Sequence, residues 1–245
     1  MQITNLQKLA KTIDHALLAT NLSYSDFDKG CILAAKYNVK TVCVKSCDVE
    51  RAQEVLDECE ANDVLVCSVV GFPYANVNEY VLFAETKMAL QLGAREIDFV
   101  IPMRHIVSEE WKTIGRLLYN MRYIVSNERN LVLKAIFETG ALTYAQMKIL
   151  CDLCMEQKID FCKTSTGFHV EYKIESKGLV TTGANPASVK FLVENAPTCK
   201  VKASGGVKSL DDVLWYVNEL GASRIGTSNT EKIMQEAIQK GWKLI

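Results

Sequence analysis

Residues 96–138, EIDFVIPMRHIVSEEWKTIGRLLYNMRYIVSNERNLVLKAIFE, contain one complete unit of strand, helix and strand. The runs near 96–102 and 131–138 are short and largely apolar, with side chains that alternate as they do in a strand. The segment near 108–127 has the apolar spacing of an amphipathic helix. A strand, a helix and a second strand in this order are typical of a parallel βαβ unit.

The same unit recurs along the chain. Strand-like runs lie near 13–18, 41–45, 65–71, 96–102, 131–138, 161–166, 200–206 and 224–228. Helical patterns lie near 25–37, 48–61, 77–92, 108–127, 143–158, 186–196, 208–220 and 230–240. Eight such units predict an α/β fold, a (β/α)8 TIM barrel, and 245 residues suffice to build one as a single domain over residues 1–245. Residues 1–12 are expected to add a short N-terminal helix that plugs or flanks the barrel bottom.

The composition argues against several classes of protein. Lys and Arg number 28 against 29 Asp and Glu, so the net charge of −1 gives no bulk attraction to nucleic acid or to an anionic membrane. No apolar run approaches the roughly 18 residues that span a bilayer. We therefore expect a cytoplasmic protein without nucleic-acid or membrane partners.

The cysteines and histidines do not form a recognisable metal site. Nine cysteines are an odd number, which argues against a complete disulfide framework. Cys151 and Cys154 are formally a C-x-x-C pair, but they follow a helical period and no second pair stands at zinc spacing, so a structural helix face is favoured over a redox or metal site. His15, His105 and His169 are dispersed. The sequence predicts no metal and no cofactor.

Two lysines interrupt apolar strand runs and suggest covalent chemistry. Lys163 and Lys202 lie in the runs near 161–166 and 200–206, and Asp98 alternates with outward-facing Ile97 and Phe99, so all three polar groups are expected to face the barrel interior. Desolvation disfavours a charged amine, and a neutral amine attacks carbonyls. A Lys-Asp pair alone could be structural, but three such groups favour Schiff-base chemistry.

Two further features, a Lys-Glu pair and two glycine turns, each allow two interpretations. Lys134 shares a face with Glu138, and the two are expected either to belong to the site or to neutralise one another beneath it. Glycines follow the last two strands, at Gly205-Gly206 and at Gly226-Thr227-Ser228, where barrels commonly bind phosphate. A two-glycine turn can also be only a turn, but this position favours phosphate binding.

Seven motifs, in order and spacing, carry a resemblance over almost the whole chain. They are Ile13-Asp14-His15, Gly71-Phe72-Pro73, Glu96-Ile97-Asp98, Glu138-Thr139-Gly140, Lys163-Thr164-Ser165-Thr166-Gly167-Phe168, Lys202-Ala203-Ser204-Gly205-Gly206 and Arg224-Ile225-Gly226-Thr227-Ser228. The chain resembles deoxyribose-phosphate aldolase, a class I lyase that reversibly cleaves 2-deoxy-D-ribose 5-phosphate to acetaldehyde and D-glyceraldehyde 3-phosphate without metal. The resemblance implies small phosphorylated sugar and aldehyde substrates, and a homodimer or higher homo-oligomer.

The resemblance also implies roles for single residues. Lys163 would form the Schiff base, Lys202 would disfavour its protonation, and Asp98 would move protons through a bound water. The residues that would hold the phosphate or line the pocket are Gly205, Gly206, Gly226, Thr227, Ser228, Asp14 and Cys43.

Several positions depart from the family pattern. Ala16 stands where a Thr is usual, Lys45-Ser46 where Asn-Pro is frequent, and the loop 169–181 is longer than usual. No tyrosine follows Tyr216, whereas some members end in a tail with a tyrosine that assists proton abstraction. Two alternatives therefore stay open: a lysine-dependent aldolase for another aldehyde or sugar phosphate, and a barrel that binds a metabolite without catalysis.

Overall fold

Eight parallel strands close into a barrel in the computed structural model, which describes residues 2–126, 130–173 and 178–243. The order around the barrel is β1, β2, β3, β4, β5, β6, β9 and β10, and β10 pairs back with β1. The strands are β1 Ile13–Ala16, β2 Thr41–Lys45, β3 Leu65–Val70, β4 Glu96–Val100, β5 Val132–Ile136, β6 Phe161–Lys163, β9 Lys200–Ser204 and β10 Arg224–Thr227. The predicted (β/α)8 barrel is confirmed.

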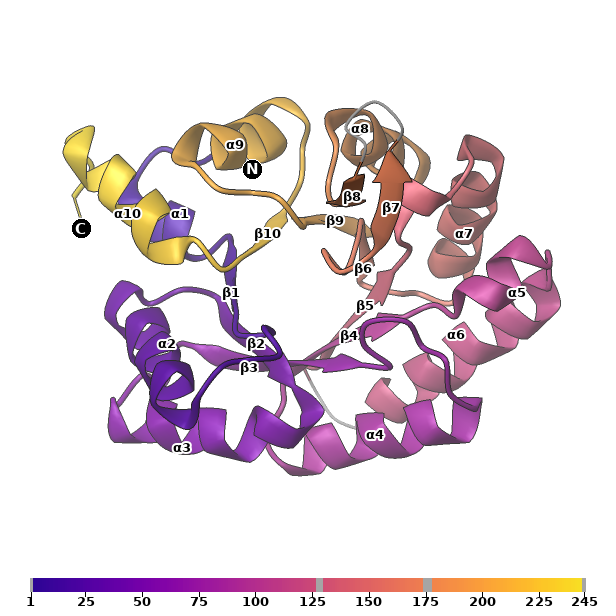
Figure 1. The fold of residues 1–245 in the computed structure, drawn as a ribbon, viewed down its shortest axis with the longest axis horizontal. Helices are drawn as coiled ribbons and strands as arrows, with labels where there is room; N and C mark the ends of the chain where they lie inside the picture. Colours follow the sequence, from indigo (N-terminus) through magenta and orange to yellow (C-terminus); the bar gives the residue numbers. More distant parts are fainter. Residues whose placement is uncertain (1, 127–129, 174–177, 244–245) are drawn as a thin grey trace.

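Helices surround this ring of strands (Figure 1). They are α1 Leu6–Ala10, α2 Tyr24–Tyr37, α3 Val49–Glu58, α4 Glu79–Gln91, α5 Met103–Val107, α6 Trp111–Ser126, α7 Tyr144–Glu156, α8 Pro186–Asn195, α9 Leu210–Leu214 and α10 Thr230–Gln239. Short turns of other helix types are η1 Ser46–Asp48, η2 Thr139–Ala141 and η3 Trp215–Glu219. None of the described helices is both long enough and apolar enough to cross a membrane.

The N-terminal helix α1 was expected from the sequence, and it flanks the barrel. Asn5 caps it by accepting a hydrogen bond from the backbone N–H of Lys8 at 2.8 Å. Leu6 and Leu9 are buried, and the helix packs beside α10 (Figure 1). Since α1 directly precedes β1, it lies at the N-terminal end of the strands, away from the end that carries active sites in such barrels.

Alternation along the strands separates two cores. On β4, Ile97 and Phe99 face outward and join the large apolar core beneath the helices. Asp98, between them, faces the barrel interior. A second and smaller apolar cluster, which includes Cys43, Cys67 and Val69, lies inside the barrel. The alternation of side chains along each strand, which predicted that Asp98 faces inward, therefore also determines which residues reach the barrel interior.

A β-hairpin fills the connection between β6 and α8, where the sequence indicated only a long loop. Its strands are β7 Val170–Lys173 and β8 Gly178–Thr181, and they pair antiparallel as a separate two-stranded sheet. The backbone N–H of Thr182 donates to the carbonyl oxygen of His169 at 2.8 Å, which closes the base of the hairpin. The hairpin lies outside the barrel sheet, so it leaves the order of the eight strands unchanged.

Candidate active site

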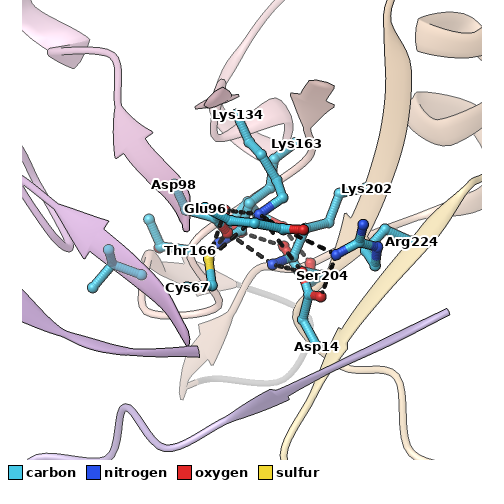
Figure 2. Close-up of polar contacts among 12 residues, drawn as sticks. Asp14, Cys67, Glu96, Asp98, Lys134, Lys163, Thr166, Lys202, Ser204 and Arg224 are labelled. Atoms are coloured by element: carbon cyan, nitrogen blue, oxygen red, sulfur yellow. Dashed lines mark hydrogen bonds and ion pairs between the residues drawn. The ribbon is translucent and has the colours of Figure 1, made fainter. Parts of the chain in front are cut away.

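Among the described residues, seven charged residues gather in the barrel interior, none of them more than 6% exposed (Figure 2). They are Asp14 on β1, Glu96 and Asp98 on β4, Lys134 on β5, Lys163 on β6, Lys202 on β9 and Arg224 on β10. Removing an ion from water costs several kcal/mol unless other charges and hydrogen bonds compensate it. The seven groups compensate one another as a single network, which we call the charged cluster.

Asp98 is the centre of the charged cluster. Its Oδ2 atom accepts hydrogen bonds from Lys163 Nζ at 2.7 Å and from Lys202 Nζ at 2.8 Å. Its Oδ1 atom accepts from Lys134 Nζ at 2.7 Å and from the Cys67 thiol at 3.2 Å. Burial would raise the pKa of Asp98, but the charges of the three lysines hold it well below its ordinary value. Asp98 is therefore a carboxylate that touches both predicted catalytic lysines.

Asp14 links Lys202 to Arg224 within the charged cluster. It pairs with Lys202 Nζ through Oδ2, and its Oδ1 accepts from Arg224 Nη1 at 2.7 Å. Burial opposes its ionisation, but Arg224 and Lys202 keep the pKa of Asp14 below its ordinary value. For Lys202 burial favours the neutral amine, yet Asp14 and Asp98 raise its pKa. Lys202 is thus held as a cation between two carboxylates.

Glu96 closes the network on its other side. Its Oε2 lies 2.5 Å from Lys134 Nζ and 3.0 Å from Arg224 Nη1. Lys134 therefore contacts Glu96 and Asp98 rather than Glu138, and the idea that Lys134 and Glu138 neutralise one another is wrong. The backbone at the end of β5 explains the difference, because Glu138 has a left-handed φ of 61° and turns away from the strand's alternation.

Glu138 instead fixes the loop that follows Lys163. Its Oε2 accepts from the backbone N–H of Thr166 at 3.1 Å and from the Thr166 hydroxyl at 2.6 Å. Thr166 in turn accepts from the backbone N–H of Phe168 at 3.1 Å. These bonds order the loop that forms one wall of the adjacent cavity.

A cavity of about 610 Å³ opens above the charged cluster. Residues from the strands at its floor include Asp14, Cys43, Lys163 and Lys202. The loops after β1, β6, β9 and β10 form its walls, and the predicted phosphate residues Gly205, Gly206, Gly226, Thr227 and Ser228 all line it. The structure thus brings every predicted site residue either to this cavity or, for Asp98, directly beneath Lys163. The loop residues lie at the C-terminal ends of the strands, where barrel enzymes carry their sites.

Glycines allow two close approaches at the cavity. A Cβ on Gly226 would lie 2.8 Å from Ser204 Cβ and 3.1 Å from Lys202 Cε, so a larger residue there would displace Lys202. A Cβ on Gly205 would lie 2.9 Å from Gly183 Cα and 3.2 Å from Gly167 Cα. Three loops therefore meet at Gly167, Gly183 and Gly205, a contact that we call the glycine junction.

The two predicted hydroxyl residues after β10 differ in their surroundings. Thr227 donates its hydroxyl to the carbonyl oxygen of Val207 at 2.7 Å and accepts from the backbone N–H of Asn229 at 2.9 Å. Thr227 thereby ties the loop after β10 to the loop after β9. Ser228 is exposed at the cavity wall.

Sequence reasoning missed several members of the site. Arg224 and Glu96 belong to the charged cluster, and Cys67 donates to Asp98. Alternation along the strands could have revealed two of them. Glu96 lies two residues before Asp98 on β4, and Arg224 lies two residues before Gly226 on β10, so each faces the same side as a predicted site residue. Lys208 also lines the cavity and adds a cation near the glycine loops. Conversely, Lys45 donates to the carbonyl oxygen of Ala19 at 3.2 Å and is not among the lining residues.

One group of metal-type donors lies within the described residues. The sulfur atoms of Cys43 and Cys67 and a carboxylate oxygen of Asp98 lie within 4.8 Å of one another. However, Asp98 already accepts from three lysines, and Lys134 Nζ lies 3.3 Å from Cys67 Sγ. Ammonium groups around the donor atoms would repel a cation. These residues therefore do not fit a resident metal.

Comparisons with known proteins identify the family. No family model matches the chain. A deoxyribose-phosphate aldolase from Clostridium perfringens (strain SM101 / Type A) is 36% identical over 225 residues, which are 91% of this chain and 92% of that protein. Another, from Metamycoplasma arthritidis (strain 158L3-1), is 36% identical over 233 residues, 95% of this chain and all of the relative.

Solved structures agree with the sequence relatives. The tetrameric deoxyribose phosphate aldolase from Aeropyrum pernix has a TM-score of 0.83 and 26% identity, covering 96% of this chain and 93% of that chain. An aldolase named QR15 has a TM-score of 0.83 and 30% identity, covering 95% of this chain and 96% of that chain. The two sequence relatives are each 36% identical to this chain over nearly its full length, and its barrel resembles that of a solved aldolase. This chain therefore belongs to the deoxyribose-phosphate aldolase family.

Proposed function

We propose that this protein is a class I aldolase that reversibly cleaves 2-deoxy-D-ribose 5-phosphate to acetaldehyde and D-glyceraldehyde 3-phosphate through a Schiff base on Lys163. The observation that carries the proposal is the unequal pairing of the two cavity lysines. Within the described residues, Lys163 is paired with one carboxylate, Asp98, whereas Lys202 is paired with two. The less paired amine is the one that can leave its partner and attack a carbonyl.

The charge balance of the cluster supports the same choice. With every group ionised, three carboxylates face four cations, so the charged cluster has one positive charge in excess. A neutral amine at one lysine would balance it. Lys134 forms ion pairs with three carboxylates and is not among the residues that line the cavity, and Arg224 does not deprotonate in proteins. Lys163, at the cavity with one carboxylate partner, is the lysine of the charged cluster that opposite charges hold least.

The reaction then proceeds in balanced steps. The Lys163 amine adds to the aldehyde carbon of the open-chain sugar, and the adduct takes up one proton and loses water to give a protonated imine. The imine withdraws electrons as the C3 hydroxyl loses its proton and the bond between C2 and C3 breaks, which releases D-glyceraldehyde 3-phosphate. The remaining two-carbon enamine takes a proton at carbon, and addition of water then releases acetaldehyde, the free amine and one proton.

The neighbours of Lys163 have separate roles in this proposal. Asp98 accepts and returns protons, through a water, and keeps the amine oriented at 2.7 Å. Lys202, held as a cation, opposes protonation of the nearby amine. Asp14 positions Lys202. Cys43 lines the floor beside the reacting end of the substrate.

The phosphate is assigned to the other end of the cavity. Gly205 and Gly206 line the cavity with left-handed φ values of 85° and 83°, a conformation that glycine adopts without strain, and they have no side chain to keep an anion from the backbone. Gly226, Thr227 and Ser228 precede the N-terminus of α10, which favours an anion, and Lys208 adds a positive charge. These loops and Lys163 line the same cavity, so one substrate can contact both.

Three broader expectations remain part of the proposal. Residues 1–245 form one domain, since the strands from both ends of the chain pair with each other in the barrel. The protein works in the cytoplasm. It assembles into a homodimer or a higher homo-oligomer, as the tetrameric relative from Aeropyrum pernix does. Sedimentation of the purified protein at several concentrations measures that assembly.

A retro-aldol assay tests the function directly. Purified protein is mixed with 2-deoxy-D-ribose 5-phosphate, and both aldehyde products are measured with coupled dehydrogenases. Equal amounts of acetaldehyde and D-glyceraldehyde 3-phosphate support the proposal. Absence of both products, together with an imine to Lys163 from another aldehyde, would indicate an aldolase with a different substrate. Absence of product and of any imine would indicate a binding protein.

A further inference from the structure

Two cysteines inside the barrel are direct neighbours on adjacent strands. Cys43 on β2 and Cys67 on β3 are paired in the parallel register, and both side chains face the interior. Their sulfur atoms lie within 4.8 Å of each other. Adjacent strands lie about 4.8 Å apart, and disulfides join Cα atoms roughly 4.4–6.8 Å apart. The backbone therefore already has the spacing of a disulfide, although both thiols are free.

The two thiols differ in their access to the cavity. Cys43 lines the cavity floor together with Lys163 and Lys202. Cys67 is fully buried behind it, donates to Asp98 Oδ1 at 3.2 Å and lies 3.3 Å from Lys134 Nζ. A small solute in the cavity therefore meets Cys43 first, and Cys67 second.

The electrostatic environment distinguishes the thiols in the same order. The neighbouring Cys67 side chain lowers the pKa of Cys43 against the effect of burial, and the charge of Lys202 adds to this lowering. Burial raises the pKa of Cys67 well above its ordinary value, and Cys43 and Asp98 add to the rise. Thiolates are the nucleophilic form, so Cys43 is the attacking sulfur and Cys67 keeps its proton.

We propose that Cys43 and Cys67 form a modification site at which a hydroperoxide produces a disulfide. The Cys43 thiol gives up its proton, the thiolate attacks the peroxide, the O–O bond breaks and a sulfenic acid forms; the leaving hydroxide, or the alkoxide of an alkyl hydroperoxide, takes up that proton and departs as water or alcohol. The Cys67 sulfur then attacks the Cys43 sulfur, the S–O bond breaks, and the hydroxyl leaves as water with the Cys67 proton. Two electrons pass from the two sulfurs to the peroxide.

The disulfide acts on the site through Asp98. Its formation removes the thiol hydrogen that Cys67 donates to Asp98 Oδ1, and it pulls Cys67 Sγ toward β2. Asp98 Oδ2 holds both Lys163 and Lys202, so a shift of this carboxylate displaces the reacting amine. This effect on turnover rests on the proposed aldolase function, whereas the sulfur chemistry itself does not. The oxidised protein is therefore an inactive aldolase that reductant restores.

The experiment uses the protein with its exposed thiols removed. In a Cys47→Ser/Cys59→Ser variant, two exposed cysteines outside the cavity are absent, and its basal activity should match that of the unmodified chain. This parent is treated with an equivalent of hydrogen peroxide, and intact mass, peptide map and residual activity are measured together. We expect loss of two hydrogen atoms, a peptide that links Cys43 to Cys67, loss of activity in the same time course and recovery of both with dithiothreitol.

Two matched variants separate the sulfurs, each normalised to its own untreated activity. With Cys67→Val, Cys43 should gain oxygen atoms and no link should form. With Cys43→Val, the mass should not change within the time in which the parent is fully oxidised. The parent itself decides the matter if either variant fails to fold.

Certain results would overturn the inference. In the parent, a link from Cys43 to any cysteine other than Cys67, or activity lost while both thiols stay free, is incompatible with it. An untreated protein without aldolase activity would refute the proposed function instead. The link between Cys43 and Cys67 would still be seen by mass in that case.

Discussion

Ser165 and Ser204 donate their hydroxyl groups to each other's backbone carbonyl oxygens, at 2.7 and 2.6 Å. Each serine stands two residues after a lysine of the site, Lys163 or Lys202. The reciprocal pair therefore joins the chain just after Lys163 to the end of β9, just after Lys202. Because both hydroxyls are consumed within the protein, we regard these serines as groups that hold the lysines in place rather than as substrate contacts.

Reductive trapping should locate the covalent intermediate. With acetaldehyde and borohydride, one two-carbon unit should appear on the peptide that contains Lys163, because its amine is the cavity amine with one carboxylate partner. Lys163→Ala should lose the label and at least about a thousandfold in kcat. Lys200→Gln, an exposed lysine at the start of β9, is the control that should keep both. A label on Lys202, or an unchanged label in Lys163→Ala, would refute the assignment.

Removing the phosphate from the substrate should lower kcat/KM, even though the phosphate is remote from the bond that breaks. Deoxyribose without phosphate should react with a kcat/KM lower by about a hundredfold or more, since charge-assisted hydrogen bonds contribute about 1.5–3 kcal/mol each. Lys208→Met should lower kcat/KM for the phosphorylated sugar but leave that for deoxyribose nearly unchanged. Equal efficiency on the two sugars would remove the phosphate site from the proposal.

Substituting Lys202 should change the pH dependence of turnover. In Lys202→Met, Asp98 Oδ2 would interact with Lys163 alone, which favours the ammonium form of that residue. The acid limb of the pH-rate profile should therefore move to higher pH, and activity near pH 7 should fall. Lys202→Leu and Lys202→Gln serve as comparisons, because they differ in how strongly they desolvate the site. If all three variants lose activity without that movement, Lys202 acts by proton transfer or substrate contact.

Chelation should leave the activity unchanged. The donors Cys43, Cys67 and Asp98 are surrounded by lysine ammonium groups, and the imine already serves as the electron sink. Activity is measured after exhaustive dialysis against a chelator, with and without added divalent ions. A large loss that one divalent ion restores would move the protein to a metal-dependent mechanism.

His15 should make the protein less stable in mild acid. Its Nδ1 lies 2.8 Å from Thr230 Oγ1, its Nε2 is buried without a hydrogen-bond partner among the described residues, and burial lowers its pKa to about 4 from an ordinary 6.5. Between these values the unfolded chain binds more protons, so the free energy of unfolding rises with pH and is lost as pH falls. From near pH 7 to about pH 4.5 this group should account for about 2 kcal/mol.

Urea unfolding at the two pH values measures the effect. His15→Gln cannot titrate in this window, so its free energy of unfolding should fall by about 2 kcal/mol less than that of the unmodified chain over the same change. Parallel curves for the two proteins would show that His15 does not contribute.

The barrel and the position of its lysines could be predicted because both follow from local periodicity. Alternation along β4 and β6 placed Asp98 and Lys163 inside, and motif spacing placed the glycine loops at the same end. Partner choice inside the barrel could not be predicted in this way. Lys134 is much nearer in sequence to Glu138 than to Asp98 or Glu96. The left-handed backbone at Glu138 nevertheless turns its side chain away from Lys134.

The insert after β6 was the main omission in the fold. Its strands are only four residues each and pair with one another, outside the barrel, so they follow none of the spacing that revealed the eight βα units. The short helix α5 was missed for a related reason, since five residues are too few for a helical period to be recognised.

The glycine junction makes the hairpin an interchangeable module. The chain leaves the catalytic wall at Gly167 and returns at Gly183, and both glycines rest against Gly205, so the two ends of the insert have fixed positions whatever lies between them. The pair from His169 to Thr182 closes the stem just beyond those positions. A protein engineer could exchange residues 170–181 for a hairpin of another length or sequence and graft new recognition at the mouth, with no change in the placement of the reacting amine.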